Sequence, residues 1–503
     1  MTTNRRSFIG SSTSALVGGS VLGVSSLPQV ARADQNLPPS RVQFRSEIEP
    51  LVQLIEDSSR DQVLKRVADR IRSGKSYQEV LTALFLAAIR NVQPRPSVGF
   101  KFHSVLVVNS CHLASLAGPD QDRWLPLFWA IDYFKSSQKD EKNRSGWQMP
   151  ALKNDAQIPM GQQAINAFTD AMDRWDVEKA DAASAGLVRS LGANQVFELL
   201  ARYAARDYRS IGHKAIYLAN GWRTLQIIGW QHAEPVIRSL VFALLNHNGE
   251  PNPAESDLGP DRSWRNNQRL LADIPATWTR GKIDDSAAQS LIECFREQSP
   301  KSAAELATEF LSSGGAAQSV WDGVFVGAGE LLMRQPGIIG LHGLTTANAM
   351  HYIWQTTKDE NVRKQVLLQA CAFNPQFRES AKGRGKVAEY NLTRLDDSND
   401  KSEPELPQIL DDMTSQKLNA AQGLYGYLNQ GGDPIQFIDD ARRLLFLKGR
   451  DAHDYKFASA VLEDYYHLSP NWRNKFLATS VFNLRGSKHS DSKLVERTRA
   501  AIG

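Results

Sequence analysis

The sequence contains few cysteines and no long apolar run, and each absence excludes a class of protein. Its three cysteines, Cys111, Cys294 and Cys371, are an odd number and lie far apart. This pattern excludes a disulfide framework and a CxxC zinc site. No segment reaches the about 18 consecutive apolar residues that a membrane-spanning helix needs. We therefore predict no membrane span in the mature protein.

A large excess of positive or negative charge is also lacking. The chain has 59 Lys and Arg against 55 Asp and Glu, a formal net charge of +4. Such a balance gives no electrostatic support for a nucleic-acid partner, and none is predicted. The 503 residues, 42% of them hydrophobic, are typical of a globular protein with a substantial core.

The first 33 residues have the layout of a targeting segment. Residues 4–10, NRRSFIG, precede a weakly apolar run rich in Gly and Ser, and residues 31–33, ARA, form an A-x-A cleavage pattern. This stretch resembles a twin-arginine export signal. The resemblance implies the export machinery as a partner, removal of residues 1–33, and a periplasmic or secreted mature protein. That route carries folded proteins, frequently with a cofactor in place, which favours a cofactor here.

Residues 34–503 are predicted to form a single all-α domain. From Arg41 onward the apolar residues recur at helical spacing, as in residues 49–71, and few stretches alternate in the manner of strands. Within this domain we find an internal repeat of a helix, a helix that begins with His, and a helix that begins near an Arg. Four such units lie near residues 78–136, 195–247, 318–373 and 437–484.

The repeat predicts that four histidines converge. Stacked helical units bury their faces on one another, so we expect a curved or closed, toroid-like array. Its equivalent histidines are His103, His213, His342 and His453. Neutral imidazoles suit a transition metal such as Fe, Cu or Zn, and an open coordination position would let it activate water or oxygen. Alternatively, each His bonds the preceding turn for packing reasons alone. The sequence contains no HExxH motif that would favour the metal site over the packing role.

Two further histidines are predicted to have packing roles. His112 and His351 each follow the first histidine of their unit by nine residues. At roughly 100° per residue, the two histidines of a unit face opposite sides of the helix. The sequence therefore predicts that His112 and His351 do not join the convergent site.

The same helices carry residues that could line a substrate pocket. We predict Tyr217, Asn220, Trp222 and Asn348 for this role, because polar groups within apolar helices are costly unless bonded and aromatic rings suit an apolar ligand. The alternative is that they fasten one helix to another. An arginine also recurs in the third helix of each unit. Such a set suits a substrate carboxylate, but an arginine in a first helical turn more often binds a neighbouring carbonyl or carboxylate, and we expect the latter.

A glycine motif at residues 326–330, VGAGE, is incomplete. Leu332 stands where a dinucleotide-binding fingerprint has its third glycine, and no strand precedes the motif. Dinucleotide binding is therefore not predicted.

Three short segments around the histidines resemble the questin-oxidase-like family of ring-cleaving oxygenases. They are residues 212–218, GHKAIYL, residues 341–347, LHGLTTA, and residues 450–454, RDAHD. The resemblance implies oxidation of a polycyclic aromatic ketone or quinone. Where the family has a second histidine near His213, this chain has Tyr217 or Asn220, and the export signal argues for an extracytoplasmic substrate.

Two functions follow from these observations as predictions. The first is an exported oxidoreductase, a metal-assisted oxygenase acting on an apolar aromatic or quinone-like small molecule. The second is a non-catalytic helical-repeat scaffold or ligand-binding protein of the periplasm.

Overall fold

The helical spacing of the sequence is realised as helix throughout the residues that the structure describes. The structure is a computed structural model and describes residues 40–94, 99–152, 157–396 and 405–503. Helices make up 73% of it, and these described residues contain no β-strand, so the all-α prediction is confirmed. The predicted export signal, residues 1–33, lies outside the described residues.

The helices up to the middle of the chain are mostly of 9 to 21 residues. They are α1 (Glu49–Asp57), α2 (Val63–Arg72), α3 (Tyr77–Asn91), α4 (Gly99–Ala117), α5 (Trp124–Arg144), α6 (Gly161–Asp173), α7 (Val177–Ser190), α8 (Ala193–Ala204), α9 (His213–Ile228), α10 (Ala233–Leu244) and α11 (Gly259–Leu270). A short 3-10 helix, η3 (Ser210–Gly212), directly precedes α9.

The second half of the chain continues in the same way. It comprises α12 (Asp285–Glu297), α13 (Pro300–Ser312), α14 (Ala317–Arg334), α15 (Ile338–Thr356), α16 (Glu360–Lys382), α17 (Leu406–Asp412), α18 (Lys417–Asn429), α19 (Pro434–Lys448), α20 (Ala452–Asp464), α21 (Pro470–Ser480) and α22 (Lys493–Ile502).

Side-chain caps fix where several of these helices begin. Ser76 and Glu79 form a capping box at the start of α3, and Asp451 and Asp454 form another at the start of α20. Such caps satisfy backbone N–H groups that have no partner within the helix. The cap at Asp451 fixes the register of α20 and thereby places His453 in its first turn.

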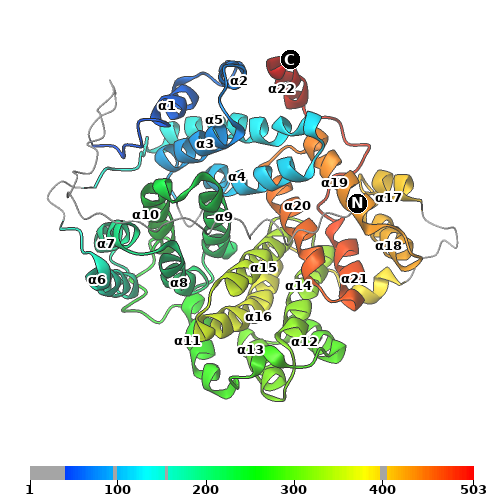
Figure 1. The fold of residues 1–503 in the computed structure, drawn as a ribbon. Coiled ribbons are helices and arrows are strands. Elements are labelled where there is room, and N and C mark those ends of the chain that lie inside the picture. Colours follow the sequence, from blue (N-terminus) through cyan, green and yellow to red (C-terminus); the bar gives the residue numbers. More distant parts are fainter. Residues whose placement is uncertain (1–39, 95–98, 153–156, 397–404) are drawn as a thin grey trace, which may run out of the picture. The chain divides into compact units, whose positions relative to one another are not determined.

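Four helices meet in the interior, and each carries one of the repeated histidines (Figure 1). Helix α4 packs against α9, α9 against α15, α15 against α20, and α20 against α4. Each of them follows one helix and precedes another within its predicted unit, as in α14–α15–α16. Helices α9 and α20 begin within one residue of His213 and His453 as predicted, whereas α4 and α15 begin four residues before His103 and His342. The repeat as a closed, toroid-like array stays a prediction.

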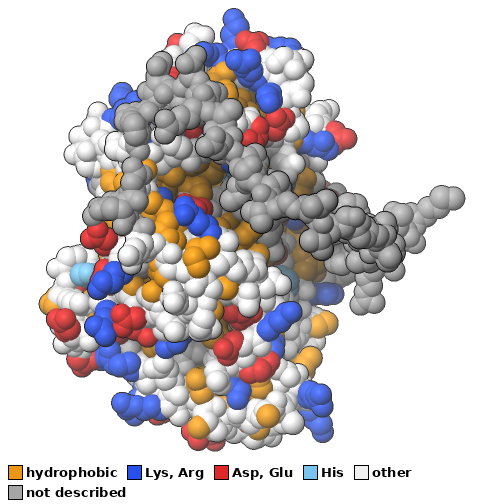
Figure 2. Space-filling view, turned by 60° about the vertical axis from the view of Figure 1, so that its left-hand side comes forward, with side chains coloured by type: hydrophobic (Ala, Val, Ile, Leu, Met, Phe, Trp, Pro, Cys, Tyr) orange, Lys and Arg blue, Asp and Glu red, His pale blue; other side chains and the backbone are white. Residues whose placement is uncertain are grey.

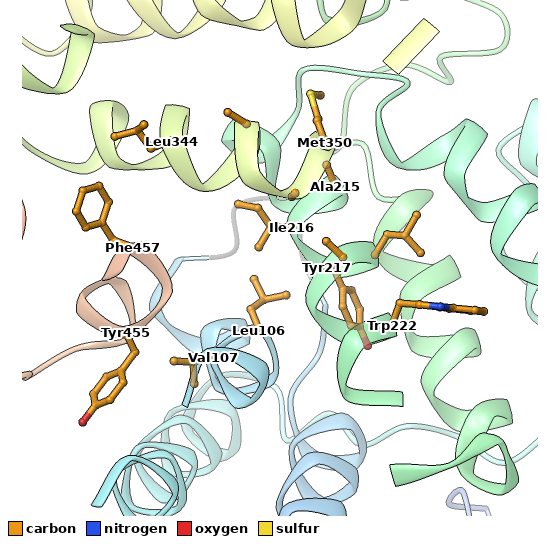
Figure 3. Packing of buried hydrophobic residues seen from close by; sticks show 14 of the residues in the cluster. Leu106, Val107, Ala215, Ile216, Tyr217, Trp222, Leu344, Met350, Tyr455 and Phe457 are labelled. Atoms are coloured by element: carbon orange, nitrogen blue, oxygen red, sulfur yellow. The ribbon is translucent and has the colours of Figure 1, made fainter. Parts of the chain in front are cut away.

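Apolar side chains from all four helices fill the space between them. Leu106 of α4, Ile216 of α9, Leu344 of α15 and Phe457 of α20 point into one cluster and are buried (Figure 3). The four helices are buried on nearly every side, which is typical of helices in the core of a large domain. Any polar residue on them is therefore exceptional and needs a partner.

On the face shown in Figure 2, Lys and Arg side chains are interspersed with Asp and Glu. Among the helices of the described ranges, none is both long enough and apolar enough to cross a bilayer.

The three cysteines are free and buried, as expected for thiols at apolar positions. From Leu37 to Gly503 the chain forms one compact unit.

Candidate metal centre

The four repeated histidines lie in the first turns of the interior helices. His213 is the first residue of α9 and His453 the second of α20, while His103 and His342 lie one turn into α4 and α15. Because these helices contact one another, residues 110 and 129 apart in the chain become neighbours. The four imidazoles are all largely buried.

Three of the imidazoles direct their Nε2 atoms at one another. The Nε2 atoms of His103 and His213 are 2.8 Å apart, and those of His213 and His342 are 3.2 Å apart. One ring nitrogen from each of the three residues lies within 4.8 Å of the other two. Bonds of about 2.0–2.1 Å to one tetrahedral ion would require nitrogens about 3.3 Å apart. The 2.8 and 3.2 Å separations lie near this value, so the three side chains form a candidate metal centre.

Backbone carbonyls determine which nitrogen of two rings carries the proton. The Nδ1–H of His342 donates to the carbonyl of Ile338 at 2.6 Å, and the Nδ1–H of His213 donates to the carbonyl of Ser210. A neutral imidazole has one donor and one acceptor nitrogen, so both Nε2 atoms are left with lone pairs. Two lone pairs facing each other repel unless a proton or a cation lies between them.

Burial keeps these imidazoles neutral. It is the main cause that lowers the pKa of His103, His213 and His342 well below the usual value, and the charge of Lys456 and the neighbouring imidazoles lower the pKa further. A proton between His213 and His342 is thus disfavoured. A metal ion needs neutral imidazoles as ligands, and burial keeps these rings in that form.

His453 lies beside this group and completes the predicted set. Its ring centroid is 4.4 Å from that of His103 and 5.2 Å from that of His342. Its Nδ1 lies 3.4 Å from a carboxylate oxygen of Asp451, and its buried Nε2 has no hydrogen-bond partner. The structure thus brings three predicted ligands together and places the ring of the fourth, His453, beside them.

Sequence reasoning missed Lys456. This lysine lies one turn after His453 and is buried, and its Nζ has no hydrogen-bond partner among the described residues. Burial lowers the pKa of Lys456 to about 7, with Asp451 opposing the shift. Lysine is almost never buried without a partner. A lysine inside an otherwise apolar stretch of α20 was the signal that could have identified it.

The segment before α9 holds an unusual backbone conformation. Ser210, Ile211 and Gly212 have φ of 54°, 49° and 82°, so three consecutive residues are left-handed. This region is unfavourable for a β-branched residue such as Ile211. A Cβ on Gly212 would come within 2.0 Å of Oγ1 of Thr346, which lies one turn after His342. Only glycine allows this approach between η3 and α15.

Buried ion pairs hold this segment on both sides. Arg209 donates to both carboxylate oxygens of Asp261, at 2.7 and 2.9 Å, and Lys214 donates to Asp207 at 2.7 Å. Buried pairs of this geometry are costly to break, because the remaining charge is left uncompensated. They keep the Ser210 carbonyl beneath Nδ1 of His213.

The residues predicted to line a substrate pocket lie on α9 and α15, and several of their polar groups bond to neighbouring helices. The hydroxyl of Tyr217 donates to Ser239 at 2.9 Å, and Nδ2 of Asn220 donates to the carbonyl of Leu106 at 3.1 Å. Trp222 packs against Phe197 and Trp230. These contacts match the helix-fastening alternative, and the pocket itself stays a prediction.

Asn348 belongs to a separate polar cluster. Its Nδ2 donates to Glu463 at 3.0 Å and to Asp464 at 2.7 Å, and its Oδ1 accepts from Arg223 at 3.3 Å. The cluster lies toward the C-terminal ends of α15 and α20, whereas the histidines lie at the N-terminal ends.

The two secondary histidines pack against aromatic side chains, and one of the recurrent arginines, Arg238, binds a carboxylate as predicted. His112 contacts the hydroxyl of Tyr77, and His351 packs against Trp321. Arg238 donates hydrogen bonds to both carboxylate oxygens of Asp181, each at 2.8 Å. These residues therefore do not belong to the histidine group.

Comparisons of the chain with known proteins identify no relative. No family model, no curated protein and no solved structure matches the chain. The geometry of the histidine group is therefore the basis for a proposed function.

Proposed function

We propose that the protein is an exported, metal-dependent oxidoreductase whose transition-metal ion is held by His103, His213 and His342, with His453 as an additional ligand. Three or four imidazoles without a thiolate suit Fe, Cu or Zn. The residues that resemble the questin-oxidase-like family favour oxygen chemistry on an apolar aromatic or quinone-like molecule. The segment at residues 1–33 favours export through the twin-arginine route.

One observation carries the metal proposal. The Nε2 atoms of His213 and His342 lie 3.2 Å apart, while carbonyl groups occupy both Nδ1 atoms. Hydrogen bonds of this kind to the outer nitrogen of a ligand histidine fix the ring and increase its basicity. Neither residue can move its proton to Nε2 without losing a bond to a buried carbonyl. A cation relieves the repulsion at no such cost.

The remaining side chains suit an open coordination position. When bound, the metal would supply Lewis acidity or redox chemistry toward oxygen or a substrate oxygen atom. Within the described part of the chain, Nε2 of His453 and Nζ of Lys456 have no hydrogen-bond partner, so they are available to hold a proton or to orient a bound molecule. The buried apolar walls around them keep bulk water out.

A second function is supported by the contact between His103 and His213. Their rings are stacked, and the 2.8 Å separation suits an N–H···N hydrogen bond when His103 carries its proton on Nε2. In that case the histidines fasten four helices together in a non-catalytic scaffold or ligand-binding protein. One such bond leaves the repulsion between His213 and His342 in place.

Metal analysis separates the two functions. The full chain is exported, recovered from the periplasmic fraction and assayed for bound Fe, Cu and Zn, alongside a His342→Gln variant. We expect close to one metal ion per chain in the wild type and a loss of most of it in the variant. Oxygen consumption with added quinones should fall with the metal content.

His112→Gln is the matched control, since His112 is also a buried histidine in an interior helix. It should retain the metal. A wild-type protein without stoichiometric metal under metal-replete growth contradicts the metal proposal and favours the scaffold. Absence from the periplasmic fraction contradicts export.

A further inference from the structure

The three clustered histidines differ in what contacts their Nδ1 atom. Nδ1 of His342 donates to the carbonyl of Ile338 at 2.6 Å. Nδ1 of His213 donates to the carbonyl of Ser210. Nδ1 of His103 is also buried, but it has no hydrogen-bond partner among the described residues. Two of the rings are therefore held at both nitrogens, and the third is held at Nε2 only.

This difference determines which ring can change its tautomer. A neutral imidazole carries its proton on either Nδ1 or Nε2. His213 and His342 would each lose a hydrogen bond to a backbone carbonyl if the proton moved to Nε2. His103 would lose no such bond within the described part of the chain. Of the three rings, His103 alone can carry its proton on Nε2 without that cost.

An acceptor for an Nε2 proton of His103 is already in place. Nε2 of His213 lies 2.8 Å away and bears a lone pair, because its own proton is on Nδ1. This separation suits an N–H···N hydrogen bond. It is shorter than the about 3.3 Å expected between two ligands of one tetrahedral ion. In the metal-free protein, His103 therefore donates to His213.

A metal ion requires the other tautomer of His103. Nε2 must then present a lone pair, and the proton moves to Nδ1, where no described residue accepts it. A buried donor without an acceptor costs free energy, and ligand histidines ordinarily have a partner at this nitrogen. His213 and His342 bear no such cost, because their tautomers already suit metal binding. The bond to His103 is therefore the weakest of the three.

We propose that His103 is the exchangeable ligand of the metal centre and yields its position to a hydroxyl-bearing molecule, such as a phenol or a hydroquinone. In this exchange the bond from the ion to Nε2 of His103 breaks, and a bond to the oxygen atom of the incoming molecule forms. The freed lone pair on Nε2 then accepts a hydrogen bond from the O–H group of that molecule. The inference rests on the proposed metal function and deepens it, since it assigns the position at which the substrate binds.

Titration with Co²⁺ tests the ranking of the ligands. The full chain is freed of metal with a chelator, and Co²⁺ is added to the wild type, His103→Leu and His342→Leu, because leucine fills the space and cannot bind a metal ion. We expect His342→Leu to weaken Co²⁺ binding at least about 100-fold, and His103→Leu less than about tenfold. An equal loss in the two variants would overturn the proposal.

Azide tests whether His103 occupies the exchangeable position. Its binding to the Co²⁺-loaded protein is followed in the absorption spectrum. In His103→Leu the position is already vacant, so azide should bind at least about tenfold more tightly than in the wild type, where it must displace the imidazole. His112→Leu is the control on the same helix, and it should bind Co²⁺ and azide as the wild type does. Equal azide affinity in the wild type and His103→Leu would contradict the exchange.

Nitrogen NMR of the wild type with labelled histidine tests the tautomers without any substitution. In the metal-free protein we expect the proton of His103 on Nε2 and those of His213 and His342 on Nδ1. A proton on Nδ1 of His103 would overturn the proposal. A wild type that binds no Co²⁺ contradicts the metal function and the exchange with it. Co²⁺ binding that depends on His103 as strongly as on His342 contradicts the exchange alone.

Discussion

At the scale of single residues, two buried lysines differ in whether their charge is matched. Lys214 donates to the buried carboxylate of Asp207 at 2.7 Å, whereas Nζ of Lys456 has no partner. Burial lowers the pKa of both, to about 8 for Lys214 and about 7 for Lys456. An unpaired buried amine destabilises a folded protein, and such residues persist at sites where they serve a function.

The two lysines should therefore respond in opposite directions to replacement by methionine. We expect Lys456→Met to raise the free energy of unfolding of the metal-free protein by at least about 1 kcal/mol, because it removes an uncompensated charge. We expect Lys214→Met to lower it by about 3 kcal/mol, because Asp207 loses its closer ion-pair partner and keeps only Arg209, at 3.5 Å. Urea unfolding at neutral pH measures both. Destabilisation by Lys456→Met would show that its amine has a stabilising partner.

At the scale of elements, the η3 segment connects two of the ligand-bearing helices. It supplies the carbonyl that orients His213, and Gly212 contacts Thr346 on the helix of His342. Strain in a short segment persists only where its surroundings over-determine it. Here the surroundings are the ion pairs of Arg209 and Lys214.

Gly212→Ala should impair metal binding as well as stability. The substitution adds a left-handed alanine, which costs about 1–2 kcal/mol, and it forces Thr346 and α15 away from α9. Gly74→Ala is the matched control, because Gly74 has φ of 100° and no atom near the added Cβ. Thermal unfolding and metal titration should show a similar strain cost in both variants and weaker metal binding only in Gly212→Ala. Equal metal affinity in both would refute the link between η3 and the site.

At the scale of the whole molecule, the candidate centre joins segments from four parts of the chain. A bound ion would connect α4, α9 and α15 directly, and those helices form the interior around which the others pack. Ligands that bind only the folded state stabilise it according to their concentration relative to the dissociation constant. Metal binding and global stability should therefore be coupled.

Adding Zn²⁺ to chelator-treated protein tests this coupling. At a free concentration about 100 times the dissociation constant, we expect the free energy of unfolding to rise by about 2.7 kcal/mol. Hydrogen exchange should slow in α4, α9 and α15 together. The His342→Gln variant should show neither change. A stabilisation of equal size in that variant would assign the effect to ions bound elsewhere.

The predicted helix starts at His103 and His342 were wrong by four residues, because α4 and α15 begin at Gly99 and Ile338. The sequence by itself determined the helical class and the four candidate ligands. These depend on local periodicity, capping residues and the recurrence of His103, His213, His342 and His453, all of which are written along the chain. The packing roles of His112 and His351 also followed, since the angle per helical residue is fixed.

Only the tertiary structure decided which nitrogens face one another and which charges lack a partner. The tautomers of His213 and His342 depend on backbone carbonyls, which no side-chain pattern reveals. The isolation of the Lys456 amine among the described residues depends on what surrounds it in space. Local propensity is set by neighbours in sequence, whereas desolvation and pairing are set by neighbours in the fold.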